Sequence, residues 1–150
     1  MCLMAIKFAI LKQADAPALR DIRGLLAQVR NGSEKEVITI SQLRDVLKDK
    51  NTLIIVAKDG VRIVGMAMLC ITVRIGRRTG QIEDVVVDSG YRGRGVGKKL
   101  MQKLIDLARE KKLKAVYLTS RPARVAANAL YQKLGFEKKD TNAYCLKLNA

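Results

Sequence analysis

Residues 85–97 read VVVDSGYRGRGVG and join an apolar, strand-like run to a long amphipathic helix. Glycine stands at positions 90, 93, 95 and 97 of this stretch, and lysines follow at positions 98 and 99. Glycines let the backbone turn tightly and bring its N–H groups against a ligand. A helix N-terminus adds unpaired N–H groups and the positive end of its dipole. The stretch therefore predicts a cradle for a phosphate or pyrophosphate group.

Three other kinds of phosphate loop do not fit this stretch. A Walker loop needs Gly-Lys-Ser/Thr, whereas Gly97 is followed by Lys98-Lys99-Leu100. A dinucleotide fingerprint needs the interval G-x-G-x-x-G within a parallel βαβ unit, and the glycines at 93, 95 and 97 have a different interval. A kinase loop lies between two strands and needs distant partners that this chain lacks.

The remaining sequence predicts strands and helices in one mixed α/β (α+β) domain. Helical spacing of apolar residues predicts helices that begin at about Asp15, Ser41, Gly95 and Ala123. Asn31-Gly32 is expected to end the first of these helices, before a polar stretch at 33–36, and Gly135 is expected to end the last. Runs of β-branched and apolar residues predict strands at 5–10, 52–57, 61–73, 81–87, 115–119, Phe136 and 144–148.

Two segments resemble the GNAT superfamily of N-acetyltransferases. Residues 92–97, RGRGVG, are similar to its motif A, Gln/Arg-x-x-Gly-x-Gly/Ala, and residues 128–136, NALYQKLGF, are similar to its second signature, Asn-x-x-(Ala/Leu)-Tyr-x-Lys-x-Gly-Phe. The resemblance implies one N-acetyltransferase domain over residues 1–150. It also implies a GNAT fold with a mixed central sheet of about six to seven strands, splayed in the middle, and about four helices.

The resemblance implies direct transfer of an acetyl group from acetyl-CoA, as acyl donor, to a primary amine. The backbone of Val85, Val86 and Val87 would pair with the pantetheine arm. The pyrophosphate would lie against Arg92, Gly93, Arg94, Gly95, Val96, Gly97 and Lys98, and the second helix would contact the cofactor through Asn128 and Tyr131.

Acetyl transfer needs a base for the amine and an acid for the departing thiolate. Tyr131 lies three residues after Asn128, hence on the same helical face, and the resemblance makes it the acid; a packed core tyrosine is the alternative. The resemblance places a carboxylate base on the strand face shared by positions 81, 83 and 85, so Glu83 is the candidate base, acting through water; its alternative is a charge-paired or substrate-orienting glutamate. Neighbours on a strand point to opposite faces, so Asp84 is expected to face away from Glu83. Gln81, Glu83 and Asp84 are the candidate substrate-binding residues.

The composition excludes several other functions. The chain has no histidine, and its three cysteines, Cys2, Cys70 and Cys145, are widely spaced, which argues against a metal site and a disulfide framework. No apolar run is long enough to span a bilayer and no signal peptide is evident, so a cytoplasmic protein without a membrane partner is expected.

The acceptor amine stays open on the sequence alone. Residues 80–87, GQIEDVVV, resemble the corresponding strand of glucosamine-6-phosphate N-acetyltransferases, but a small amine, a peptide or protein N-terminus, or a lysine also fits. A net charge of +15 leaves one rival, a basic RNA- or ribosome-associated GNAT-like module without catalysis. Two phenylalanines, four tyrosines and no tryptophan argue against nucleic-acid binding through stacked bases. Members of the family often form homodimers through their C-terminal strands.

Overall fold

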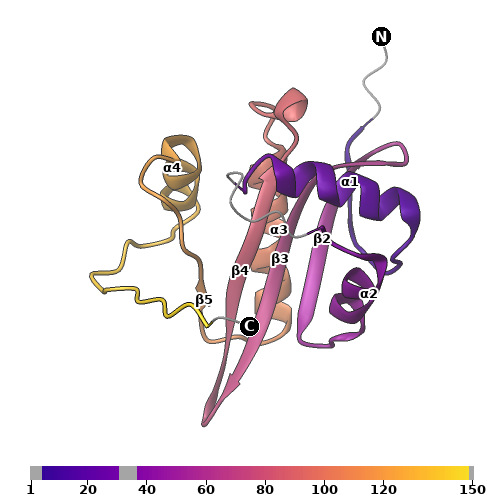
Figure 1. Cartoon of the computed structure of the whole chain (residues 1–150). Coiled ribbons are helices and arrows are strands. Elements are labelled where there is room, and N and C mark those ends of the chain that lie inside the picture. Colours follow the sequence, from indigo (N-terminus) through magenta and orange to yellow (C-terminus); the bar gives the residue numbers. More distant parts are fainter. Residues whose placement is uncertain (1–4, 31–36, 149–150) are drawn as a thin grey trace. The chain divides into compact units, whose positions relative to one another are not determined.

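The structure is a computed structural model that describes residues 5–30 and 37–148 (Figure 1). Its chain divides into two compact units, Met1–Thr119 and Ser120–Ala150. The expected helix stop at Asn31-Gly32, the polar stretch at 33–36 and Cys2 lie outside the described residues. No helix in the part of the chain that the structure describes is long and apolar enough to cross a membrane.

The first unit contains a five-stranded sheet in the order β1-β2-β3-β4-β5. Its first four strands run antiparallel to their neighbours, and β5 runs parallel to β4. This mixed sheet confirms the predicted fold class. The strands are β1 (Lys7–Ile10), β2 (Thr52–Asp59), β3 (Arg62–Arg74), β4 (Arg77–Val87) and β5 (Val116–Tyr117).

Helices cover both faces of this sheet. Figure 1 shows α1 (Ala16–Ala27) in front of β3 and β4, and α3 (Val96–Glu110) behind them. Side chains of α1 and α2 (Ile40–Lys48) form a core with one face of β2 and β3. On the other face, Leu100, Met101 and Leu104 of α3 are fully buried. The sheet is therefore an apolar middle layer, as its runs of β-branched and aliphatic residues predict.

Two glycines set how closely the layers approach. A Cβ atom at Gly65 would lie 3.2 Å from the Leu100 side chain of α3. At Gly80, where β5 joins β4, it would lie 2.7 Å from the Leu69 side chain. Larger residues at these positions would push α3 and β5 away from the strands they contact.

Side-chain caps fix the starts of α1 and α2. Asp15 accepts a hydrogen bond from the Ala18 N–H at 2.8 Å, as the predicted start near Asp15 requires. Thr39, rather than Ser41, caps α2: its hydroxyl accepts from the Gln42 N–H, and the Gln42 side chain accepts from the Thr39 N–H. The sequence-based cap was wrong by two residues because the reciprocal box favours Thr39.

The described residues contain fewer strands than the six to seven expected. The predicted strands at Phe136 and 144–148 are not formed. Tyr144, Leu146 and Leu148 are 91%, 84% and 83% exposed, so alternate residues of this segment bury no apolar face. A strand needs both ladder hydrogen bonds and a packed face, and the sequence pattern alone guarantees neither.

Candidate functional site

One edge of β4 loses its partner strand partway along. β4 pairs with β5 only at Gly80↔Val116 and Gln81↔Tyr117, yet β4 continues to Val87. Beyond Gln81, no other strand of the described residues pairs with this edge. Backbone N–H and C=O groups at such an edge can pair with an extended ligand as if it were an added strand. β5 itself ends at Tyr117, so the splay of two longer parallel strands stays a prediction.

A β-bulge interrupts β4 beside this edge. Asp84 and Val85 lie opposite a single residue of β3, Ala67, because Glu83 pairs with Met68 and the next pair in the register skips two residues of β4. Asp84 has a φ of 49°, a left-handed conformation that is uncommon for residues other than glycine. The bulge breaks the alternation of side chains at this point of the strand.

Because of the bulge, the side chains of β4 do not lie on the faces of the sheet that regular alternation predicts. Gln81 and Glu83 still share a face of the sheet, but the prediction that Val85 continues it is wrong, since Val86 takes that place in the register. The Asp84 carboxylate forms a 3.8 Å ion pair with Arg30, just beyond α1. Regular alternation, which would turn Asp84 away from Glu83, is absent at this point of β4.

Cys70 lies beside these residues on β3, paired with Gln81. Burial raises the pKa of its thiol, and the negative charge of Glu83 raises it further. A nucleophilic cysteine needs the opposite shift, toward the thiolate, so Cys70 is unsuited to covalent catalysis. Cys145 is exposed, and no group of metal-binding side chains occurs within residues 5–30 and 37–148.

The glycine-rich loop follows directly from the end of β4. A short 3₁₀ turn, Ser89–Tyr91, is closed by the Asp88 carboxylate, which accepts from the Gly90 N–H at 3.0 Å. Gly93 and Gly95 have φ values of 74° and 77°, a region that favours glycine. A Cβ at either position would meet no atom within 4 Å, so the backbone conformation, not a lack of space, requires glycine there.

The glycine-rich loop leads directly into the start of α3. Gly95 is the N-terminal cap residue, and no side chain caps this helix. The first helical hydrogen bond runs from the Lys99 N–H to the Gly95 carbonyl, so the N–H groups of Val96, Gly97 and Lys98 have no acceptor within the helix. These donors and the helix dipole favour an anion at this end.

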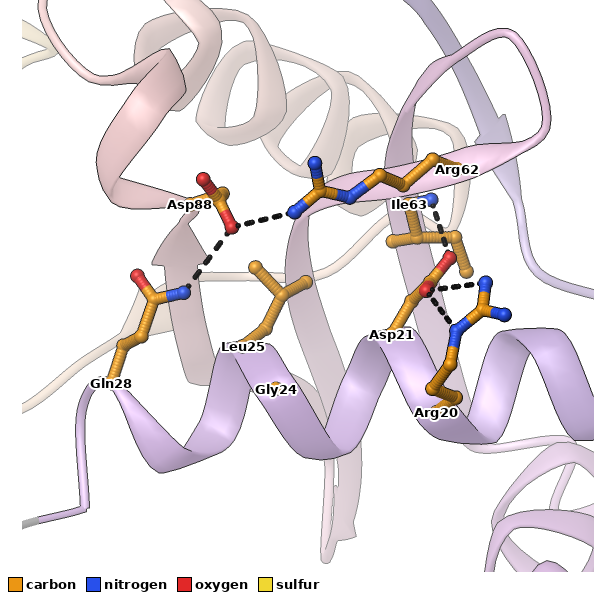
Figure 2. Close-up of a pocket in the computed structure, with 8 residues that line it drawn as sticks. All are labelled: Arg20, Asp21, Gly24, Leu25, Gln28, Arg62, Ile63 and Asp88. Carbon is orange, nitrogen blue, oxygen red and sulfur yellow. Dashed lines mark hydrogen bonds and ion pairs between the residues drawn. The ribbon is translucent and has the colours of Figure 1, made fainter.

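A network of polar side chains holds the loop against the end of α1. Figure 2 shows the Gln28 amide and the Arg62 guanidinium converging on the Asp88 carboxylate, at 3.3 and 3.2 Å. The Gln28 carbonyl oxygen also accepts from the Ser89 N–H at 3.0 Å and from Arg92 at 3.3 Å. Gln28 therefore makes three hydrogen bonds to the loop, and no sequence motif marks it.

The groove in Figure 2 is the seam between α1 and the start of β3. It encloses about 480 Å³. Its charged groups satisfy one another: Asp21 accepts from the Ile63 N–H at 2.9 Å and pairs with Arg20 at 2.9 Å. This seam fixes α1, and hence Gln28, relative to the strand that leads into the loop.

The cationic residues predicted for the pyrophosphate make contacts within the loop. The Arg92 Nε–H donates to the Val87 carbonyl at 3.0 Å. The Arg94 guanidinium lies 5.5 Å from the centre of the Tyr91 ring, and Lys98 is exposed. Arg92 thus shapes the turn after β4, and its role at a pyrophosphate stays a prediction.

The second unit contains α4 (Val125–Lys133), which carries Asn128 and Tyr131. The Asn128 amide donates to the Arg121 carbonyl at 3.0 Å and ties the preceding turn to the helix. Tyr131 is 8% exposed, and burial raises the pKa of its hydroxyl while the positive charge of Arg124 opposes that rise. The phenol is therefore protonated at neutral pH, as an acid must be.

The end of α4 explains part of the second signature. Gly135 has a φ of 92°, and its N–H donates to the Gln132 carbonyl. The Phe136 N–H donates to the Tyr131 carbonyl at 3.0 Å, and the two rings pack edge to face with their centres 6.0 Å apart. This is a Schellman cap with its usual apolar contact, so the predicted stop at Gly135 is confirmed.

Comparison with known proteins agrees with this geometry. The model of the acetyltransferase (GNAT) family matches residues 18–136. A glucosamine 6-phosphate N-acetyltransferase of Trypanosoma brucei brucei is 34% identical over 134 residues, 87% of this chain and 88% of the relative. N-alpha-acetyltransferase RimI of Mycobacterium tuberculosis is 36% identical over 85 residues, 55% of this chain and 50% of the relative.

A solved structure shows that this chain also shares its fold with a known acetyltransferase. The crystal structure of a Trypanosoma brucei acetyltransferase superposes with a TM-score of 0.75 and is 29% identical. The match covers 96% of this chain and 100% of that chain. The architecture described above is thus shared over nearly the whole length of both proteins.

Replacing Gln28 by leucine tests whether the network shapes the loop. Q28L removes three hydrogen bonds but keeps an apolar stem of similar size, so we expect acetyl-CoA to bind about 5- to 20-fold more weakly by calorimetry. The melting temperature should change little, because the contacts are exposed. The matched control is Gln102→Leu, whose amide donates only to Asp106 on the outside of α3. Equal affinity of Q28L and the control would contradict the assignment.

Proposed function

Because the chain belongs to the GNAT family of acetyltransferases, it is an N-acetyltransferase that uses acetyl-CoA, and we propose that its acceptor is the amine of an amino sugar phosphate. The relative that spans most of both chains is named for glucosamine 6-phosphate. A net charge of +15 also favours an anionic acceptor. A cytoplasmic location and a homodimer remain predictions from the sequence.

A peptide amine is the second candidate. It is supported by the similarity to an N-alpha-acetyltransferase, which runs over 85 residues, 55% of this chain. The sugar phosphate has broader support, because its relative matches 87% of the chain, including the region before the glycine-rich loop.

The donor site rests on one observation. β4 continues past β5 without a partner strand, and the chain then passes through the glycine-rich loop into a start of α3 that no side chain caps. In this proposal the pantetheine arm pairs with the backbone of Val85–Val87 and the pyrophosphate binds the N–H groups of residues 93–98. Gly93 and Gly95 supply the turn that presents those groups. Arg94 and Lys98, both exposed, add positive charge without needing to leave a carboxylate partner.

The chemistry needs no covalent enzyme intermediate. The deprotonated amine attacks the thioester carbonyl carbon, the C–N bond forms, and the C–S bond of the tetrahedral intermediate then breaks. Glu83, exposed on β4, takes the amine proton through water in this proposal. Tyr131 donates a proton to the departing thiolate in this proposal, and its raised pKa keeps the phenol protonated at neutral pH until that step.

A panel of acceptors tests the proposed function. Thiol release from acetyl-CoA would be measured with glucosamine 6-phosphate, glucosamine and a peptide with a free N-terminus. We expect kcat/KM for the phosphorylated sugar to exceed that for glucosamine about tenfold or more, the equivalent of one charge-assisted hydrogen bond. Equal values for the two sugars, or a clear preference for the peptide, would reject the sugar phosphate while leaving acetyl-CoA use intact.

Tyr131→Phe tests the acid. Loss of general acid catalysis should lower kcat about 100-fold with little change in the KM for acetyl-CoA. Burial raises the pKa of Tyr131 above its ordinary value of 10.0, so the wild-type acid keeps its proton as pH rises and no loss of rate from this group is expected below pH 10. Turnover of Y131F at the wild-type rate would rule out this role.

A further inference from the structure

The β3–β4 hairpin extends beyond the packed core. Every residue from 72 to 78 is exposed, whereas Ile71 and Thr79 on either side are buried. Figure 1 shows the joined ends of β3 and β4 reaching past the end of β2. This part of the hairpin, residues 72–78, buries no apolar face, so core packing does not account for its length.

Six cations gather on this hairpin and beside it. The Lys114 N–H donates to the Arg78 carbonyl at 2.9 Å and holds the loop after α3 against β4. Within residues 5–30 and 37–148, none of the six pairs with a carboxylate. They are Arg74, Arg77, Arg78, Lys111, Lys112 and Lys114, and we name them the hairpin patch.

Charge repulsion between two arginines of the hairpin destabilises the isolated protein. Lys111 and Lys112 lie at the C-terminal end of α3, where its dipole favours cations. Arg74 and Arg77, in contrast, are directly opposite each other in the register, and like charges in that position destabilise a sheet. A polyanion bound to the hairpin patch would relieve this repulsion.

We propose that the hairpin patch is a docking surface for duplex DNA, with the ribbon of residues 72–78 in the major groove. A two-stranded ribbon fits the wide major groove of B-form DNA but not the deep, narrow groove of A-form RNA. Phosphate contacts need only cations, so the scarcity of aromatic residues does not oppose them. Ile75, fully exposed at the tip, would reach the base edges.

This surface is separate from the glycine-rich loop. The hairpin patch lies at the start of β4, and the glycine-rich loop follows its end at Val87. Ten residue steps of strand span about 33 Å. The inference therefore goes beyond the proposed function, because DNA at the hairpin patch would leave the glycine-rich loop uncovered.

The test measures fluorescence anisotropy of a labelled 20-base-pair DNA duplex titrated with the full chain at several KCl concentrations. The variant R74Q/R77Q/R78Q should bind at least tenfold more weakly, and the slope of log K against log salt should fall by about three. The control K12Q/K48Q/K103Q removes the same charge from exposed lysines elsewhere and should keep most of the wild-type slope. A far-UV circular dichroism spectrum that matches the wild type verifies that each variant is folded.

Three results would overturn the proposal. The first is equal loss of DNA affinity in the hairpin variant and the control. The second is an A-form RNA duplex of the same length that binds as tightly as the DNA. The third is binding to vesicles containing phosphatidylserine, but not to DNA, with the affinity lost in Ile75→Ser, which would make the exposed isoleucine a lipid contact instead.

Discussion

The parallel pairing of β4 with β5 ends after two residue pairs, and the candidate site depends on that limit. Gly80 allows the close approach that starts the pairing, because a Cβ atom there would lie 3.1 Å from the Val116 side chain of β5. Beyond Gln81 the same edge of β4 continues alone toward the glycine-rich loop. If β5 followed β4 to Val87, its own backbone would satisfy the groups that the proposed pantetheine arm needs.

The residues that directly follow α1 contact both the bulge of β4 and the loop after it. Gln28 bonds to the loop that follows β4, and Arg30, two residues later, pairs with Asp84 at the bulge. One helix end therefore contacts both the proposed pyrophosphate cradle and the strand that carries the candidate base. A shift of α1 would therefore move the proposed binding sites of both acetyl-CoA and the acceptor amine. Every contact involved is polar and partly exposed.

Local sequence patterns predicted those features that depend on residues close together in the chain, such as glycine turns and helix ends. Gly93 and Gly95 do have the left-handed conformation that a tight loop needs, and Gly135 does end α4. The bulge at Asp84 could not be predicted, because an extra residue is visible only against the partner strand. Gln28 was missed for a similar reason: its partners lie about 60 residues away in the sequence. The strand expected at 144–148 is not formed, because an alternating pattern of apolar residues does not guarantee a partner strand.

Amide hydrogen exchange with and without acetyl-CoA tests most directly whether this edge and loop form the donor site. The account predicts slower exchange on binding at those amides of 85–87 that face away from β3 and at the amides of 93–98, because the ligand would supply acceptors along the open edge of β4 and at the start of α3. Exchange in the hairpin at 72–78 should stay unchanged. Acetyl-CoA binding that is saturable by calorimetry but leaves exchange at both 85–87 and 93–98 unaltered would contradict the account.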